Sequence, residues 1–247
     1  MKVFKKKLFA VLTILFSLAA VTPAFALAET QAKEVTVQIN GVDIKGTATH
    51  WVPGKVWVDA MAYAETLGLD YEVVDQQFVI NGKSLDMKEY NGKPTVHIRA
   101  IAEATGAENV DWDFSSGLAY VLDLPDGSIA LEGTNDFYAP GVPGMGQHWG
   151  MPNELPRGPI YGVEQGKLVF IEQMIAQEDF VNGVNHIDIP GMKGLPSPPV
   201  QHTDIEYLDA GHPGFETPHF DIHHYFVTHE EHLKFSPVPT GEVGHGH

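Results

Sequence analysis

The chain has 247 residues, of which 43% are hydrophobic and 19% charged, so it can bury a core as one large domain or two smaller ones. Its 15 Lys and Arg against 32 Asp and Glu give a formal net charge of −17, which excludes the phosphate attraction needed for binding nucleic acids or anionic membranes. Because there is no cysteine, disulfides, thiolate zinc sites and iron–sulfur clusters are excluded, and any metal ion must be held by His, Asp or Glu.

Residues 1–28 have the parts of a secretory signal peptide. A basic segment at 2–7 precedes an apolar run at 8–20, and small residues suited to cleavage lie at 24–28. The apolar run is shorter than the roughly 20 residues that cross a membrane, and no later stretch reaches that length. The sequence therefore predicts a secreted, extracytoplasmic protein with no membrane partner after cleavage. An uncleaved anchor is the alternative.

Two similar segments of about 40 residues follow the leader. Ile39-Asn40-Gly41 recurs as Ile80-Asn81-Gly82, and residues 54–68 align without gaps on 92–106. In each segment, alternating apolar residues predict strands, Asn-Gly predicts a tight turn, and an Ala-rich stretch that ends at Gly predicts a short helix. Further short strands are expected at 71–74, 78–80, 110–113 and 118–122. The first half is therefore predicted to be a repeated β-β-α-β-β module.

The second segment carries a recognisable signature. It reads V-H-I-R-A-I-A-E-A-T-G-A over 96–107 and V-D-W-D over 110–113. This resembles the V-P-x-R-x-I-A-E-x-x-G-A and V-x-W-D pattern of the copper amine oxidase N-terminal-like domain, over about residues 35–124. His97 replaces the usual Pro, and Met61 takes the Arg position in the first segment.

The resemblance implies a small α+β module, at residues 29–126, of a kind appended to many exported bacterial proteins. A cell-wall component is one partner that such a module could have. Amine oxidase chemistry is not implied, because the oxidase needs a Tyr in an Asn-Tyr-Asp/Glu context and the sequence has no Asn-Tyr pair. For Arg99, Glu103 and Trp112 we expect structural roles, as a domain-internal ion pair and a core indole.

The second half of the chain has a different composition. Only His50 and His97 precede residue 128, and all other histidines follow it. The boundary is predicted near 124–127, where Pro and Gly end the second segment. Because Gly and Pro recur from there on, we expect a loop-rich, mainly β domain over 127–235, sandwich or barrel-like, with strands at 167–176 and 219–227. A flexible His-containing tail is expected at 236–247.

The strand at 219–227 gives the strongest chemical signal. Since side chains alternate between faces, one face is predicted to be polar and the other to be a core face. The polar face holds His219, Asp221, His223 and Tyr225, and the core face holds Phe220, Ile222, His224 and Phe226. Residues two apart are separated by about 6.6 Å and residues four apart by about 13 Å, so one strand cannot complete a metal site. The candidate pairs are His219 with His223, and His223 with Asp221 or Tyr225; His148, His212 or His186 would supply a further ligand.

A second resemblance ranks these residues. The shared motifs are M-G-x-H-W at 145–149, G-P-I-Y-G at 158–162, a strand like 168–172, and P-H-F-D-x-H-x-Y at 218–225. Together they resemble a poorly characterised family of exported bacterial proteins over about residues 135–230. The resemblance implies that the separated motifs meet in one β domain. The predicted metal ligands are His148, Glu172, His212, His219, Asp221 and His223, and imidazole with carboxylate favours Zn or Cu.

Several alternatives stay open. The histidines could be hydrogen-bonded structural residues, with Asp221 orienting an imidazole. His229 and His232 flank Glu230-Glu231 at a spacing of three, which is not the H-E-x-x-H zinc helix. Serine hydrolase, nucleotide-binding and haem motifs are missing from the sequence, so no nucleotide or haem is expected. Two functions remain: an exported, cell-envelope protein that binds a metal or small ligand, and a small secreted metalloenzyme, hydrolytic or oxidative, with an open coordination position.

Overall fold

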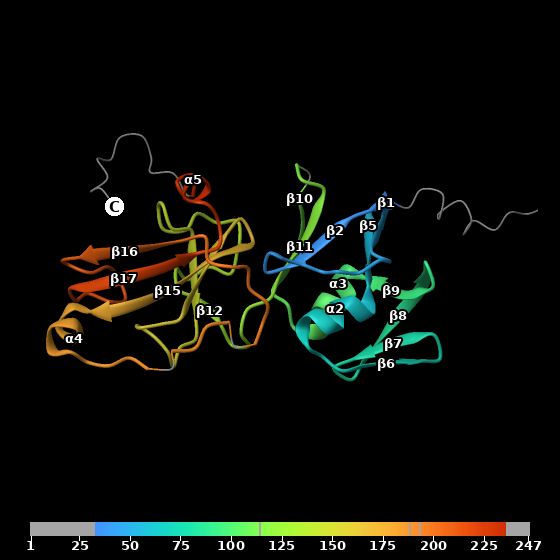
Figure 1. Ribbon diagram of the computed structural model, residues 1–247, viewed down its shortest axis with the longest axis horizontal. Coiled ribbons are helices and arrows are strands. Elements are labelled where there is room, and N and C mark those ends of the chain that lie inside the picture. Colours follow the sequence, from blue (N-terminus) through green and yellow to red (C-terminus); the bar gives the residue numbers. More distant parts are fainter. Residues whose placement is uncertain (1–32, 114, 188, 193, 236–247) are drawn as a thin grey trace, which may run out of the picture. The chain divides into compact units, whose positions relative to one another are not determined.

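The computed structural model describes residues 33–113, 115–187, 189–192 and 194–235 (Figure 1). The predicted signal peptide at 1–28 and tail at 236–247 lie outside these residues. The described chain is mostly β, with short helices and three sheets of seven, four and six strands. None of its helices has the length and hydropathy that crossing a membrane requires.

Two sheets form from the first half of the chain. The seven-stranded antiparallel sheet runs in the order β1 (Lys33–Glu34), β4 (His50–Val52), β5 (Lys55–Asp59), β9 (Lys93–His97), β8 (Lys83–Tyr90), β7 (Gln77–Ile80), β6 (Tyr71–Val74). The four-stranded sheet runs β10 (Asn109–Asp113), β11 (Leu118–Leu122), β2 (Thr36–Ile39), β3 (Val42–Asp43), with β11 and β2 parallel. These sheets and the helices α2 (Ala60–Leu67) and α3 (Ile98–Thr105) share one apolar core, which includes Tyr63, Phe78 and Ile101.

Local sequence explains the turns and helix ends of this half. Asn40 and Gly41 both have positive φ, 50° and 84°, as do Asn81 and Gly82, 48° and 71°, so the predicted Asn-Gly turns are confirmed. The Asp59 side chain caps α2 by accepting a hydrogen bond from the backbone nitrogen of Ala62. Both helices end at a glycine in the left-handed conformation, as the sequence predicts.

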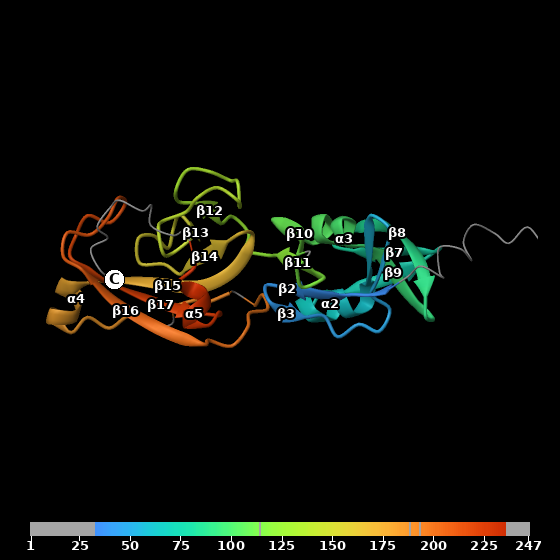
Figure 2. The same ribbon diagram turned by 90° about the horizontal axis from the view of Figure 1, so that it is seen from above.

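The third sheet forms from the second half. Its order is β12 (Ile129–Ala130), β13 (Gln147–Gly150), β14 (Ile160–Glu164), β15 (Lys167–Ala176), β17 (His219–Tyr225), β16 (His202–Leu208), all antiparallel. Short helices α4 (Gln177–Asn182) and α5 (His229–His232) follow β15 and β17. The predicted strand at 167–176 is confirmed, and β17 ends two residues before the predicted strand does. Figure 2 shows β15, β17 and β16 side by side.

One apolar cluster spans the segment where the domain boundary was predicted. It includes Tyr120 and Leu124 from one side and Trp149, Tyr161 and Leu168 from the other. The backbone nitrogen of Leu168 also donates to the Tyr120 hydroxyl at 3.1 Å. No strand of the third sheet pairs with a strand of the other two in the described chain, so side-chain packing rather than a shared sheet connects these segments.

Candidate metal centre

The strand β17 presents a buried polar face. His219, Asp221, His223 and Tyr225 are at most 1% exposed, whereas the intervening Phe220, Ile222 and His224 are partly exposed. The predicted division into two faces therefore holds, but the expected core face is the more exposed of the two. His224 is not a core histidine; its Nδ1 lies 3.1 Å from the Thr203 hydroxyl.

Strand register places further polar residues on the same face. Glu172 of β15 lies opposite His223, and Asp204 and Glu206 of β16 lie opposite His223 and Asp221. Directly opposite residues of paired strands project from the same side of a sheet, so carboxylates flank the β17 histidines on both edges.

Glycine at position 162 lets His148 approach this face from β13. His148 lies opposite Gly162, which in turn lies opposite Phe170 of β15. A Cβ at Gly162 would come within 2.2 Å of the Phe170 ring, so that ring occupies the space a side chain would need. The His148 and His223 rings pack against Phe170, with ring centroids at 5.5 and 5.0 Å.

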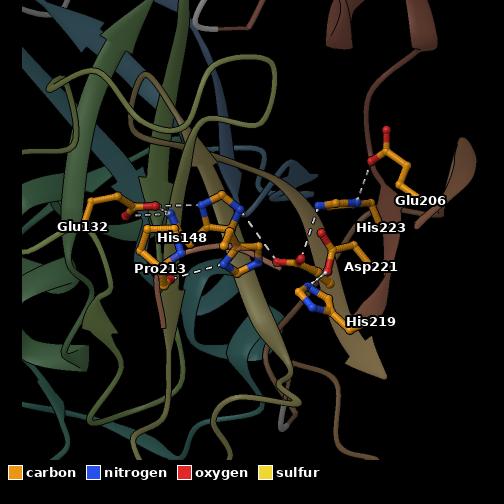
Figure 3. A network of polar contacts seen from close by, with 9 residues as sticks. Glu132, His148, Glu206, Pro213, His219, Asp221 and His223 are labelled. Carbon is orange, nitrogen blue, oxygen red and sulfur yellow. Dashed lines mark hydrogen bonds and ion pairs between the residues drawn. The ribbon is translucent and has the colours of Figure 1, made fainter. Parts of the chain in front are cut away.

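His148, Glu172 and His223 form the first cluster, called here the inner group. Figure 3 shows His148 and His223 with the carboxylates of Glu132 and Glu206 beside them. The Nε2 atoms of His148 and His223 lie 3.7 and 3.5 Å from the two carboxylate oxygens of Glu172. On their other nitrogens, His148 Nδ1 lies 2.7 Å from Glu132 and His223 Nδ1 lies 3.5 Å from Glu206. A carboxylate on Nδ1 orients a metal-ligating imidazole and directs its Nε2 lone pair inward.

His212, His219 and Asp221 form the second cluster, the loop group, named for the β16–β17 connection that holds His212. His219 Nδ1 lies 2.6 Å from the Thr217 carbonyl oxygen, and His212 Nδ1 lies 3.2 Å from that of Pro213. A carbonyl can only accept, so both rings donate from Nδ1 and, when neutral, carry a lone pair on Nε2. His219 Nε2 nevertheless lies 3.0 Å from Asp221 Oδ1, an acceptor facing an acceptor.

Buried acceptors without hydrogen bonds gather in these two groups. Within the described residues, Glu172 Oε2, His219 Nε2 and both carboxylate oxygens of Asp221 are buried and make none. An unsatisfied buried polar group costs about 1–3 kcal/mol, and more if it is charged. Each group brings three ligand atoms within 4.8 Å of one another, so these residues could hold a metal ion.

The pKa values follow from burial and charge. Burial raises the pKa of Glu172 and of Asp221 above their usual values. Burial lowers the pKa of His148, but the hydrogen bond to Glu132 and the charge of Glu172 outweigh it, so the net direction is upward. Two buried carboxyls that resist ionisation are the environment in which a cation most stabilises the charged form.

The structure brings all six predicted ligands into these two groups. None of the three candidate pairs is kept together: His219 and Asp221 fall into a different group from His223, and Tyr225 belongs to neither group. His186 lies apart from both, with its Nε2 3.2 Å from Asp179. Reasoning from sequence missed Glu132 and Glu206. Glu206 follows His202 and Asp204 with strand alternation, whereas Glu132 has no signal that separates it from the other acidic residues.

Comparisons with known proteins give little. No family model matches the chain, and no curated protein matches it. Among solved structures, the chain is similar to the hypothetical protein TTHB210 from Thermus thermophilus, with 25% sequence identity and a TM-score of 0.37. That similarity covers 40% of this chain and 90% of the other.

Proposed function

We propose that the protein is an exported, cell-envelope binding protein that holds a divalent transition-metal ion at the inner group, with the loop group as a second position beside it. The observation that carries the proposal is the set of buried, unbonded acceptors of Glu172, His219 and Asp221. A cation placed among them would offset the cost of burying these acceptors. Two imidazoles with a carboxylate suit Zn or Cu.

Protons are the alternative to a metal ion. If His219 were protonated it could share a proton with Asp221, and the histidines would then be purely structural. In the inner group, the Nδ1 atoms of His148 and His223 face Glu132 and Glu206, which directs the opposite nitrogen of each ring toward Glu172. An outer carboxylate on each ligand histidine is the usual arrangement around a bound metal.

Burial favours binding over catalysis. Glu172, His219, Asp221 and His223 are at most 2% exposed. A metalloenzyme built from these residues would need an open coordination position that substrate can reach. The secreted metalloenzyme uses the same residues. Because these residues are buried, it is the second candidate rather than the first.

The first half is proposed to be the appended module that the sequence resemblance implies. In its support, residues 50–80 and 83–122 have the same order of elements, β4–β5–α2–β6–β7 and β8–β9–α3–β10–β11. Export rests on the leader at 1–28, and a cell-wall component is the proposed partner of the module. Sedimentation of the full-length protein with purified peptidoglycan tests this, and protein that stays in the supernatant would contradict it.

Metal content tests the binding proposal. The experiment uses the full-length protein without an affinity tag, and His245→Gln and His247→Gln remove its terminal histidines. The protein is dialysed against Zn²⁺, and mass spectrometry measures the zinc bound per chain. We expect the His148→Ala/His223→Ala variant to lose one equivalent of zinc. His224→Ala, on the other face of β17, is the matched control and should retain it. Equal zinc in all three proteins would overturn the proposal.

A further inference from the structure

A third cluster of histidines lies outside the centre described above. His202, Asp204, His229 and His232 bring four ligand atoms within 4.8 Å of one another. We call them the pocket group. Its members are all partly or fully exposed, whereas the inner group is buried, so the pocket group faces an accessible space.

Two elements assemble the pocket group. Residues 202 and 204 share one face of β16, and His202 lies opposite Tyr225 of β17. His229 and His232 are three apart on α5, which places them on one side of a helical turn. The Thr228 hydroxyl caps that turn by accepting a hydrogen bond from the Glu231 backbone nitrogen.

The Tyr225 ring holds both elements together. His202 stacks on it with ring centroids 4.6 Å apart, and His232 stacks on it at 4.0 Å. Tyr225 is 1% exposed, so it is a fixed surface for both imidazoles. The ligand atoms are therefore positioned before any ion arrives, which reduces the entropy lost on binding.

The neutral rings of His202 and His232 carry fewer N–H groups than the hydrogen-bond acceptors around them require. His202 Nδ1 lies 3.1 Å from the Val227 carbonyl, to which it must donate, so a neutral His202 has a lone pair on Nε2. That atom lies 3.4 Å from His232 Nδ1, and Asp204 Oδ2 lies 3.8 and 3.6 Å from these two nitrogens. A neutral His232 holds one hydrogen, and its ring also bonds the backbone of Gly144. A cation would accept the lone pairs of His202 Nε2, His232 Nδ1 and the Asp204 carboxylate at once.

A cavity of about 470 Å³ borders the cluster. Asp204, His229 and His232 line it, together with the apolar side chains of Met145, Leu233 and Phe235. The cavity leaves room for water or another small ligand on an ion held by the cluster, as an open coordination position requires.

We propose that His202, Asp204, His229 and His232 form a further site for a divalent transition-metal ion, open to solvent and built from none of the ligands of the buried centre. Three imidazoles and one carboxylate select Zn²⁺, Co²⁺, Ni²⁺ or Cu²⁺ over Mg²⁺ or Ca²⁺, which prefer oxygen ligands. The site requires none of the six ligands of the inner and loop groups, so it stands or falls independently of the proposed function.

Cobalt absorption tests the proposal. Co²⁺ is titrated into the full-length protein that carries His245→Gln and His247→Gln, and visible absorption and bound cobalt are recorded together. We expect His229→Ala/His232→Ala to lose the one equivalent of cobalt, and the absorption band, that belong to the pocket group. His148→Ala/His223→Ala should keep that equivalent and that band and lose only the cobalt bound at the inner group. Asp204→Asn, which preserves side-chain size, should weaken cobalt binding at this site by about 10-fold or more.

Controls separate ligand loss from misfolding. His224→Ala, also a histidine of this sheet but on its other face, should leave the cobalt titration unchanged. Each variant is checked by circular dichroism and by its melting temperature without metal. Unchanged cobalt stoichiometry in both His229→Ala/His232→Ala and Asp204→Asn would overturn the proposal, as would an equal loss in His224→Ala. Loss of cobalt only in His148→Ala/His223→Ala would leave the buried centre standing and remove the pocket site.

Discussion

Glu172 on β15 lies directly opposite His223 on β17, and its Oε1 atom is 3.5 Å from His223 Nε2 while both side chains are at most 2% exposed. A cross-strand pair of this kind is fixed by sheet register, because a slip of one strand by one residue would place the two side chains on opposite faces of the sheet. The position of the Glu172–His223 pair is therefore set by the pairing of two strands rather than by a loop.

Glu172→Gln should destabilise the metal-bound protein without destabilising the metal-free protein. Since burial raises the pKa of Glu172, replacing it by a neutral amide should leave the metal-free protein as stable or more stable at pH 8 and above. With Zn²⁺ present, the variant should melt at a lower temperature than the unmodified protein, because a ligand is lost. Thermal unfolding in EDTA and in Zn²⁺ measures both. A purely structural carboxylate would instead give the same loss of stability in both conditions.

Glu132→Gln should weaken metal binding without removing a ligand. Glu132 lies 2.7 Å from His148 Nδ1 and orients the ring, and such outer partners typically contribute 10–100-fold in affinity. We expect a loss of about that size in the Zn²⁺ dissociation constant, at unchanged stoichiometry, by calorimetric titration. Glu178→Gln, an exposed acid on α4, serves as the control. If both variants bind zinc equally well, Glu132 does not position His148.

Gly162→Ala should disturb the approach of His148 to the sheet. The added methyl would lie 2.2 Å from the Phe170 ring, and overpacking of this kind costs about 1–3 kcal/mol of the free energy of unfolding. Zinc affinity should fall as well, since His148 and His223 both pack on Phe170. Gly191→Ala, where a Cβ meets nothing within 4 Å, is the matched control. Urea denaturation measures both variants, and equal stability would show that Phe170 moves aside freely.

Glu108 should make folding stability fall as pH rises. Burial raises its pKa to about 7 from the ordinary value of 4.5, so between these values the folded protein binds more protons than the unfolded chain. The contribution of this carboxyl is therefore most favourable below about pH 4.5 and is lost as pH rises through about 7. Urea denaturation in EDTA at pH 5, 6 and 8 should show this decline in the free energy of unfolding. The decline should be smaller in Glu108→Gln, whose amide oxygen can still accept the hydrogen bond from the Leu124 nitrogen. If the free energy of unfolding declines equally in Glu108→Gln, the effect belongs to other groups. The same conclusion follows if Glu103→Gln, the control at an exposed site, abolishes the decline.

Strand periodicity made part of this arrangement predictable. Alternation along 219–225 places His219, Asp221 and His223 on one face whatever the tertiary structure. The same alternation does not say which face other elements cover. The aromatic residues at 220 and 226 suggested a core face, yet the polar face is the buried one. Burial is set by packing partners from elsewhere in the chain, and local hydrophobicity does not identify them.

Two strands and the pocket group could not be predicted from the sequence. The strands β13 and β14 lie in a segment where Gly and Pro indicate loops, although Gly162 is a strand residue whose missing side chain accommodates Phe170. The pocket group went unrecognised because His202 and His232 are 30 residues apart in the sequence and come together only in the folded chain, where both stack on Tyr225. The three-residue spacing of His229 and His232 excluded the H-E-x-x-H zinc helix, and it did not indicate which residues elsewhere in the chain could complete a metal site with them.

The most direct test of the buried centre is the position of the metal itself. Crystals of the full-length protein grown with Zn²⁺ would be measured at the zinc absorption edge, and an anomalous difference map would locate each ion. The account predicts a peak among His148 Nε2, His223 Nε2 and the Glu172 carboxylate, at about 2.0–2.2 Å from each ligand atom. Crystals that contain zinc but show no peak at these three residues would contradict it.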